Sequence, residues 1–278
     1  MGGSGTAAGG TVSGGSGGDV SQGGSAGSVT SGGSSANGGS AAQGGSSAGS
    51  GGSAGKGGVD GGAGAPAIKL ELIDDLEDGD KQITVVNNPL RNGIWDTGHD
   101  TTSGATQTPT PGAFKPIDLG SDVPYAGDLF AAYTKGQGFM AYGAFMNVSM
   151  TLAADPKYDA TRYSGISFWA KVGTGSTKAM RVRFISGDTD PRGKICKDPA
   201  VTPSATQPEY CFNHYYSSMA LSTSWKQYRL DFTNDFHQGT DGMTFASINL
   251  KTMYGLEFYF NVDEVFEVWI DDLSFVVK

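Results

Sequence analysis

The chain has 278 residues, of which 45 are Gly, and a formal charge of −9 at pH 7. Because binding to a phosphate backbone needs clustered Lys and Arg, this balance argues against nucleic acid as a partner. No apolar run reaches the 18 or so residues of a membrane span, and the opening "MGGSGT" lacks the basic and apolar regions of a signal peptide. We expect no transmembrane segment; either an export signal is absent from this chain or the protein stays inside the cell.

Residues 1–67 are almost wholly Gly, Ser and Ala, without an aromatic residue and with only Asp19, Lys56 and Asp60 as charges. Such a segment has too little apolar surface to offset the entropy of ordering its backbone. It predicts a disordered low-complexity linker with a mean span of roughly 40 to 50 Å. All the Trp, Tyr and Phe residues fall in residues 68–278, which predict one domain with a charge near −8.

The domain opens with "LIDDLEDGD", Leu72 to Asp80, where five acidic side chains fall within nine residues. The long polar segment "WDTGHDTTSGATQTPTP" that follows is typical of a loop. The next apolar run, "GFMAYGAFMNVSM", fits a buried strand or a short helix, and Gly138 and Gly143 favour the strand. A short helix is expected from Pro156 to Thr161.

Strict alternation of apolar and polar residues dominates the second half of the domain. It is clearest in four segments: "ISFWAKV" (Ile166 to Val172), "MRVRFIS", "KQYRLDF" and "GLEFYFNV". Period-two alternation between Gly-, Pro- and Asp-rich turns predicts an all-β, antiparallel sandwich or jelly roll. The one helix expected here is short, from Phe245 to Leu250.

Cys196 and Cys211 are the only cysteines, and they flank a Pro-rich loop. Two reduced buried thiols are the alternative, but a lone pair around a loop without metal-binding spacing favours a disulfide. A bridge that closes about 15 residues contributes roughly 3 kcal/mol in the chain-entropy model. Because disulfides persist in oxidising compartments, the bridge implies an exported protein.

A second acidic pair, Asp271 and Asp272, stands near the end of the domain. If the first and last strands run side by side, these carboxylates meet the opening cluster and need a cation. Ca²⁺ is the expected ion, because it takes carboxylate and carbonyl oxygens in flexible geometry. The alternative is a solvated acidic turn beside an ordinary edge strand.

The segments "LIDDLEDGD", "ISFWAKV" and "FEVWIDDLSFVVK" resemble carbohydrate-binding jelly rolls of the galactose-binding-like class, above all families 11 and 4. "NGIWDTGHD", "DTDPRGKIC", "CFNHY" and "VWIDDLSF" are similar to uncharacterised secreted or lipoprotein-type proteins of myxobacteria with one such domain. The resemblance implies a structural Ca²⁺ held by Glu77 and Asp271. In that subgroup Asp often stands at the position of Asn213 and Trp at that of Tyr142, so loop specificity is in doubt.

Sugar binding needs aromatic rings for pyranose C–H faces and planar polar groups for hydroxyls. We expect Tyr259, with Glu257 and Asn261 beside it, to form part of a concave binding face, and Trp169 and Trp269 to be packing residues. The further candidates are Trp95, Tyr142, Tyr215 and Tyr216. A non-catalytic, monomeric polysaccharide-binding module displayed outside the cell is the leading interpretation.

Two other functions remain open at this point. The loop residues His99, Asp100, Asp188, Asp190 and His214 offer acid, base or metal-ligand chemistry for a polysaccharide lyase or hydrolase. Convergence of His99, His214 and Asp190 in one cleft would favour that enzyme. A flat, aromatic-free concave face would favour an adhesion or scaffold protein.

Overall fold

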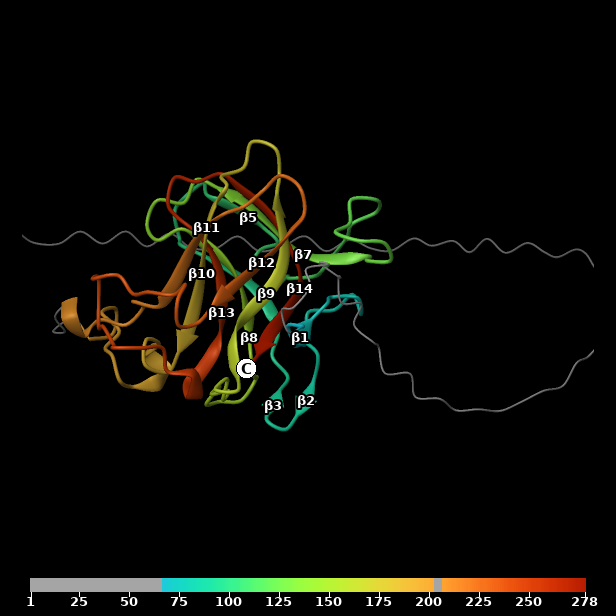
Figure 1. The fold of residues 1–278 in the computed structure, drawn as a ribbon. Helices are drawn as coiled ribbons and strands as arrows, with labels where there is room; N and C mark the ends of the chain where they lie inside the picture. The colour runs from blue at the N-terminus through green and yellow to red at the C-terminus, as the bar shows by residue number, and fades with distance from the viewer. Residues whose placement is uncertain (1–66, 203–206) are drawn as a thin grey trace, which may run out of the picture. The chain divides into compact units, whose positions relative to one another are not determined.

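The computed structural model of the chain describes residues 67–202 and 207–278. Apart from Ala67, the predicted Gly/Ser/Ala linker lies outside these residues. The described chain forms an antiparallel sandwich of two main sheets with a separate two-stranded hairpin, β2 (Val86–Asn87) and β3 (Leu90–Arg91) (Figure 1). The all-β jelly roll predicted from the sequence is confirmed.

The seven-stranded sheet has a central path in the order β12-β9-β14-β7-β5, with β1 added to β14 and β6 to β7. Its strands are β1 (Leu70–Asp74), β5 (Thr106–Thr108), β6 (Ile117–Asp118), β7 (Phe130–Gln137), β9 (Tyr163–Val172), β12 (Lys226–Asp231) and β14 (Phe266–Val277).

The five-stranded sheet has the order β11-β10-β13-β8-β4. Its strands are β4 (Trp95–His99), β8 (Ala144–Ser149), β10 (Ala179–Ser186), β11 (Tyr215–Ala220) and β13 (Met253–Phe260). The apolar run that fitted either strand or helix therefore ends in a strand, β8.

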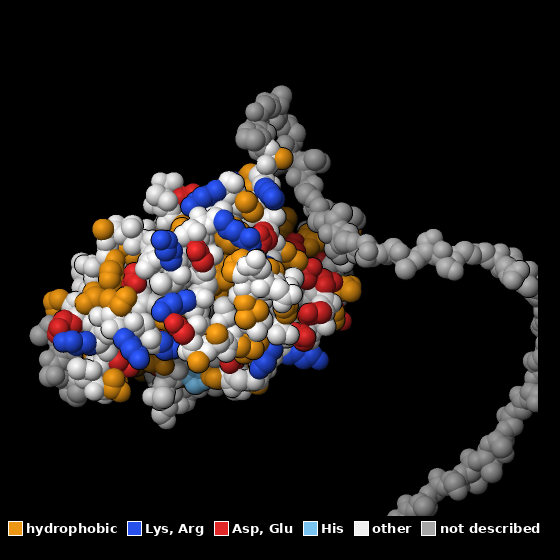
Figure 2. Space-filling model, turned by 90° about the horizontal axis from the view of Figure 1, so that it is seen from below, with side chains coloured by type: hydrophobic (Ala, Val, Ile, Leu, Met, Phe, Trp, Pro, Cys, Tyr) orange, Lys and Arg blue, Asp and Glu red, His pale blue; other side chains and the backbone are white. Residues whose placement is uncertain are grey.

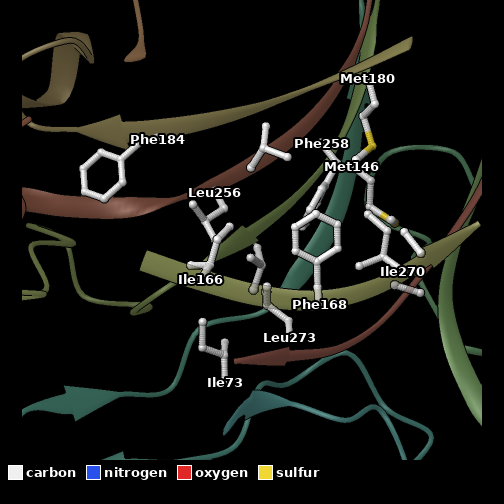
Figure 3. Close-up of a cluster of buried hydrophobic side chains, with 14 of the residues drawn as sticks. Ile73, Met146, Ile166, Phe168, Met180, Phe184, Leu256, Phe258, Ile270 and Leu273 are labelled. Carbon is white, nitrogen blue, oxygen red and sulfur yellow. The ribbon is translucent and has the colours of Figure 1, made fainter. Parts of the chain in front are cut away.

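The core lies between the two sheets and is built by the alternation seen in the sequence. In β9, Ile166 and Phe168 are fully buried, and in β13 the same holds for Leu256 and Phe258. The rings of Phe168 and Phe258 meet edge to face across the sandwich, with centroids 5.4 Å apart. Figure 3 shows these side chains converging from strands of both sheets.

Both short α-helices expected from the sequence are wrong. Tyr158, in the first expected segment, forms an isolated antiparallel bridge with Met253, so its backbone is committed to a β partner. The second segment ends in a 3₁₀ turn, η3 (Leu250–Thr252), capped by Asn249. The other 3₁₀ turns in the described ranges are η1 (Pro191–Gly193) and η2 (Gln207–Glu209). No helix in the described ranges has the length and apolarity that crossing a bilayer needs.

The first and last strands lie side by side, as expected. β1 pairs antiparallel with the second half of β14, from Leu70 opposite Val276 to Asp74 opposite Leu273. The first half of β14 pairs instead with β7. β14 therefore changes partner midway along its length, and the pairing of β14 with β9 shifts register between Asp271 and Ser274.

The disulfide between Cys196 and Cys211 is confirmed. It closes the long connection between β10 and β11, so Phe212, Asn213 and His214 enter β11 from a fixed point. Because this connection borders the five-stranded sheet, the disulfide holds in place the residues that build one side of the candidate site.

Candidate functional site

The outer face of the five-stranded sheet presents polar and aromatic side chains in two cross-strand rows. Antiparallel register places residues of neighbouring strands directly opposite one another, within contact distance. One row runs Ser218, Arg181, Tyr259, Phe145, Gly98, and the next runs Tyr216, Arg183, Glu257, Asn147, Asp96. We call this surface the outer face; planar polar groups occupy its middle.

Two cavities lie on the outer face, one on each side of Arg183 and Glu257. The larger, of about 220 Å³, is bordered by β10, β11 and the segment that follows Cys211. The smaller, of about 90 Å³, lies over β8 and β13 against the loop after β10. The larger is lined by Arg181, Arg183, Phe212, Asn213, His214, Tyr216, Gly239 and Asp241, and the smaller includes Asn147, Ser149, Asp190, Arg192 and Glu257.

Charge pairs fix the middle of the outer face. Arg183 lies 3.6 Å from Glu257 and stacks over the ring of Tyr259, 3.3 Å from its centroid. Burial raises the pKa of Glu257, and the adjacent Arg183 opposes that shift. The expected position of Glu257 on this face is therefore found, but the Tyr259 ring lies beneath a guanidinium and is only 6% exposed. As placed, that ring is not open to stack on a sugar.

Tyr142 and Asn261 lie at the β8 end of the face. Tyr142 is 53% exposed; its hydroxyl donates to the carbonyl of His99, and its own carbonyl accepts from the hydroxyl of Tyr259. Asn261 follows β13 and is held in a turn by Glu264, whose carboxylate accepts from its backbone N–H at 2.8 Å. The ring of Tyr142 is therefore accessible to a ligand.

Two predicted sugar platforms belong to the core instead, which corrects the sequence interpretation. Trp95 is fully buried, stacked 5.9 Å from both Phe114 and Phe258. Tyr215 is 7% exposed and donates its hydroxyl to the carbonyl of Phe245 at 2.6 Å. Its neighbour in β11, Tyr216, takes the outward position and lines the larger cavity.

The loop candidates do not all converge: Asp190 lies near His214, but His99 is remote from both, so the condition set for an enzyme is not met. His99 lies on the edge strand β4, whereas His214 precedes β11 at the opposite edge of the same sheet. Four strand spacings separate those edges, about 19 Å at the usual interstrand distance. Asp190, next to β10, is paired with Arg192 at 2.8 Å, and Asp188 accepts from Asn249.

His214 is buried, and the hydroxyl oxygen of Thr189 lies 2.7 Å from its Nδ1. Burial, reinforced by Arg183, lowers the pKa of His214 to about 3. The imidazole is therefore neutral at neutral pH and cannot serve as a general acid there.

Asp100 organises the loop that carries Tyr142. One carboxylate oxygen accepts from the backbone N–H groups of Ala141, Tyr142 and Gly143, each at 2.9 Å, and the other from Thr102. Burial opposes its ionisation, but these hydrogen bonds outweigh it and hold the pKa of Asp100 below its usual range. The role of Asp100 in the structure is thus to position backbone.

Replacing Asp100 by Ala is expected to lower the free energy of unfolding by about 3 kcal/mol at pH 7, since four backbone N–H groups lose a charged acceptor. Because the folded-state pKa is depressed, this contribution is complete above pH about 4 and is lost as pH falls. Urea unfolding at pH 7 and pH 3 measures both effects. The control is Asp118→Ala, an exposed residue with one turn hydrogen bond; equal losses for both variants would contradict the prediction.

A second feature lies at the junction of β1, β7 and β14, which we call the acid junction (Glu77, Asp128 and Asp271). The Asp128 carboxyl group interacts with those of both Glu77 and Asp271. Glu77 Oε1 also accepts from the N–H groups of Leu129 and Phe130, at 3.0 Å each. The sequence prediction named Glu77 and Asp271, and the structure adds Asp128 between them.

The acid junction contains buried oxygen atoms without partners. Asp271 is fully buried and Asp128 is 4% exposed. Both oxygens of Asp128, and Oδ2 of Asp271, have no hydrogen-bond donor. Burial raises the pKa of both carboxyl groups; the neighbouring Glu77 adds to the rise at Asp128, and Asp128 adds to the rise at Asp271. This oxygen set suits a hard cation, although no three His, Cys, Asp or Glu side chains of the described residues are arranged to hold a metal by themselves.

The segment between β6 and β7 includes Asp128 and contacts the outer surface of the seven-stranded sheet. The ring centroids of Tyr125 and Trp169 are 6.3 Å apart. The backbone carbonyl of Asp122 accepts a hydrogen bond from the indole N–H of Trp225. Trp269 contacts Tyr133 at 5.0 Å on the same surface. Trp169 and Trp269 are thus partly covered by neighbouring groups on the sheet opposite the outer face.

Figure 2 shows acidic side chains gathered at one end of one side of the domain.

No protein-family model matches the chain, and no curated protein matches it. Among solved structures, the chain is similar to the family 11 carbohydrate-binding module of the cellulosomal cellulase Lic26A-Cel5E of Clostridium thermocellum, at 14% identity and a TM-score of 0.44. That alignment covers 77% of this chain and 97% of the other.

A family 30 carbohydrate-binding module of the cellulosomal cellulase Cel9D-Cel44B of the same organism follows, at 13% identity and a TM-score of 0.39, over 66% and 91% of the two chains. The chain is also similar to the K1 cleaved adhesin domain of Lys-gingipain from Porphyromonas gingivalis W83, at 11% identity and a TM-score of 0.37. That alignment covers 77% of this chain and 99% of the other. Likeness at this level concerns the fold only and does not identify a ligand.

Proposed function

We propose that the domain is a non-catalytic module that binds a polysaccharide on the outer face. The observation that carries the proposal is the pair of cavities on either side of Arg183 and Glu257, with polar side chains from four adjacent strands. Carboxylate, amide and guanidinium groups in a row suit the hydroxyls of successive sugar units, and two neighbouring cavities suit a chain.

Aromatic side chains at both ends of the outer face support the proposal. The exposed Phe212 stands at the β11 end, and Phe145 and Tyr142 stand at the β8 end. A Cβ at Gly98 would lie 2.3 Å from the Phe145 ring, so the glycine allows that ring to lie close over β4. Rings in these positions can contact sugar C–H faces, and a scaffold surface without a ligand has no need of them.

We further propose that Ca²⁺ stabilises the fold at the acid junction. Asp128 and Asp271 would supply carboxylate oxygens, with Glu77 beside Asp128. A bound Ca²⁺ would neutralise carboxylates whose burial otherwise favours their protonation. The role is structural, since the junction lies on strands of the other sheet from the outer face.

Display outside the cell on the predicted linker is part of the same proposal. The disulfide supports it, because such bonds persist in exported proteins. A monomer is the expected state.

Screening against soluble β-glucan, xylan, mannan and uronic-acid polymers by affinity gel electrophoresis tests the binding proposal. We expect retention on at least one polymer, and at least about tenfold weaker binding for Asn147→Ala, which removes a planar polar group from the middle of the outer face. Gln227→Ala, on an exposed position of β12 in the other sheet, is the matched control. Absence of retention on every polymer, or equal loss in both variants, would refute the proposal.

A further inference from the structure

The larger cavity on the outer face contains an arginine without an acidic partner. Two other arginines around the outer face are neutralised: Arg183 pairs with Glu257 and Arg192 pairs with Asp190. Arg181 also lines the cavity, and among the described residues no carboxylate lies within ion-pair distance of it. The chain as a whole carries −9, so an unpaired guanidinium here is a local exception.

The side chain of Arg181 is held in place without being neutralised. Its guanidinium lies over the ring of Tyr216, 4.9 Å from the centroid, and Tyr216 in turn contacts the ring of His237 at 4.3 Å. Stacking on an aromatic face orients a guanidinium and leaves its edge N–H groups available to a ligand. Arg183, two residues along β10 and on the same face, presents a second guanidinium to the cavity.

We propose that this cavity receives a carboxylate-bearing sugar, a uronic acid unit of the polysaccharide, with Arg181 pairing with its carboxylate. This inference rests on the proposed function and names the chemical class of its ligand. The planar fork of Arg matches a carboxylate with two parallel hydrogen bonds, a stronger interaction than any single hydroxyl makes. The cavity volume of about 220 Å³ is below that of a typical drug-sized site, which suits one sugar unit of a longer chain.

The other groups of the cavity fit a sugar ring around that carboxylate. Phe212, which is 51% exposed, and Tyr216 both line the cavity and provide aromatic groups. His214 is neutral, so it adds hydrogen-bonding capacity without charge. The cavity lining also includes one exposed carboxylate, that of Asp241, together with the guanidinium groups of Arg181 and Arg183.

Net charge does not prevent this recognition. Charges more than about 8 Å apart are largely screened at physiological ionic strength, so most acidic groups of the protein act weakly on a ligand in the cavity. A charge-assisted pair at contact distance is screened much less when it is partly buried. Short-range pairing therefore decides the preference, and raised ionic strength should weaken it only in part.

The test compares each acidic glycan with its own neutral form. Oligogalacturonates and glucuronoxylan oligosaccharides are titrated into the full chain by calorimetry, beside the same material after chemical reduction of the carboxyl groups. We expect the better acidic ligand to bind at least about tenfold more tightly than its reduced form. Arg181→Gln should abolish this preference, and Arg181→Lys should keep part of it, because charge without the planar fork remains.

Arg229→Gln is the matched control, an exposed arginine on β12 in the other sheet, and should leave the preference intact. Circular dichroism and melting of the variants identify any that fail to fold. Equal affinity for acidic and reduced glycans would overturn this inference while the proposed function stands. Binding of a sulfated glycan but no uronate would overturn the carboxylate assignment, and no binding to any glycan would overturn both proposals.

Discussion

Chelation of divalent ions is expected to lower the melting temperature of the domain by about 10 °C. A ligand present at a thousand times its dissociation constant stabilises the folded state by about 4 kcal/mol. For a domain of this size each kcal/mol shifts the melting temperature by about 2 to 4 °C. The physical reason is that Asp128 and Asp271 are buried with three carboxylate oxygens lacking donors, so without a cation these groups must either take up protons or stay charged without a partner. Calorimetry with 1 mM CaCl₂ or excess EDTA, at about pH 7, measures the shift.

The variant Asp128→Asn makes this test specific. It should melt at the same temperature with and without EDTA, because it lacks a charged ligand and one of the repelling groups. In EDTA it should be at least as stable as the wild-type protein, since an uncompensated buried charge has been removed. Asp78→Asn, an exposed change in the same acidic segment, should keep the response to Ca²⁺. A wild-type melting temperature that EDTA leaves unchanged, with no metal in elemental analysis, would contradict the calcium proposal.

Replacing Trp95 by Ala is expected to lower the free energy of unfolding by about 5 kcal/mol, the largest single-residue effect that we predict. Loss of a buried Trp side chain costs about 3 to 5 kcal/mol. Its indole N–H also donates at 2.7 Å to Asp74, which is 2% exposed. Loss of that donor leaves a buried carboxyl oxygen unpaired and adds about 1 to 3 kcal/mol. Urea denaturation monitored by circular dichroism gives the value.

Trp95→Phe separates packing from hydrogen bonding. It should cost less than Trp95→Ala, about 1 to 3 kcal/mol, because a ring still fills the space between Phe114 and Phe258. Trp225→Phe, whose indole bonds a surface carbonyl, is the control and should cost about 1 kcal/mol or less. A Trp95→Phe protein of wild-type stability that no longer retains glycan would restore Trp95 as a sugar platform and refute its assignment to the core.

Strand positions were predictable where apolar and polar residues alternate strictly. Each of the four alternating segments overlaps a strand of the structure, namely β9, β10, β12 and β13. Trp95 was harder to place because the other inward positions of β4 are Thr97 and His99, and the outward ones include Gly98. A strand with so few apolar residues looks like a loop. In β11 the adjacent Tyr215 and Tyr216 differ only in which side of the sheet they face, and single-residue composition does not reveal that.

The acid junction was predictable in part. Glu77 and Asp271 stand out because they belong to acidic clusters near the two ends of the domain. Asp128 is a single acid between "YAG" and "LF", with no neighbouring acidic residue in the sequence. Its partners are about 50 and 140 residues away, so only the pairing of β14 with β1 and β7 brings them together. Arg181 was missed for a related reason: its lack of a partner is a property of the surface and not of the strand.

The position of β14 also orders events during protein synthesis. β14 lies between β9 on one side and β7 and β1 on the other, although it includes residues 266–277. Until the ribosome has released those residues, β1, β7 and β9 have no strand to join them. The nascent polypeptide therefore emerges without its central strand and reaches its native topology only after translation of the domain is complete.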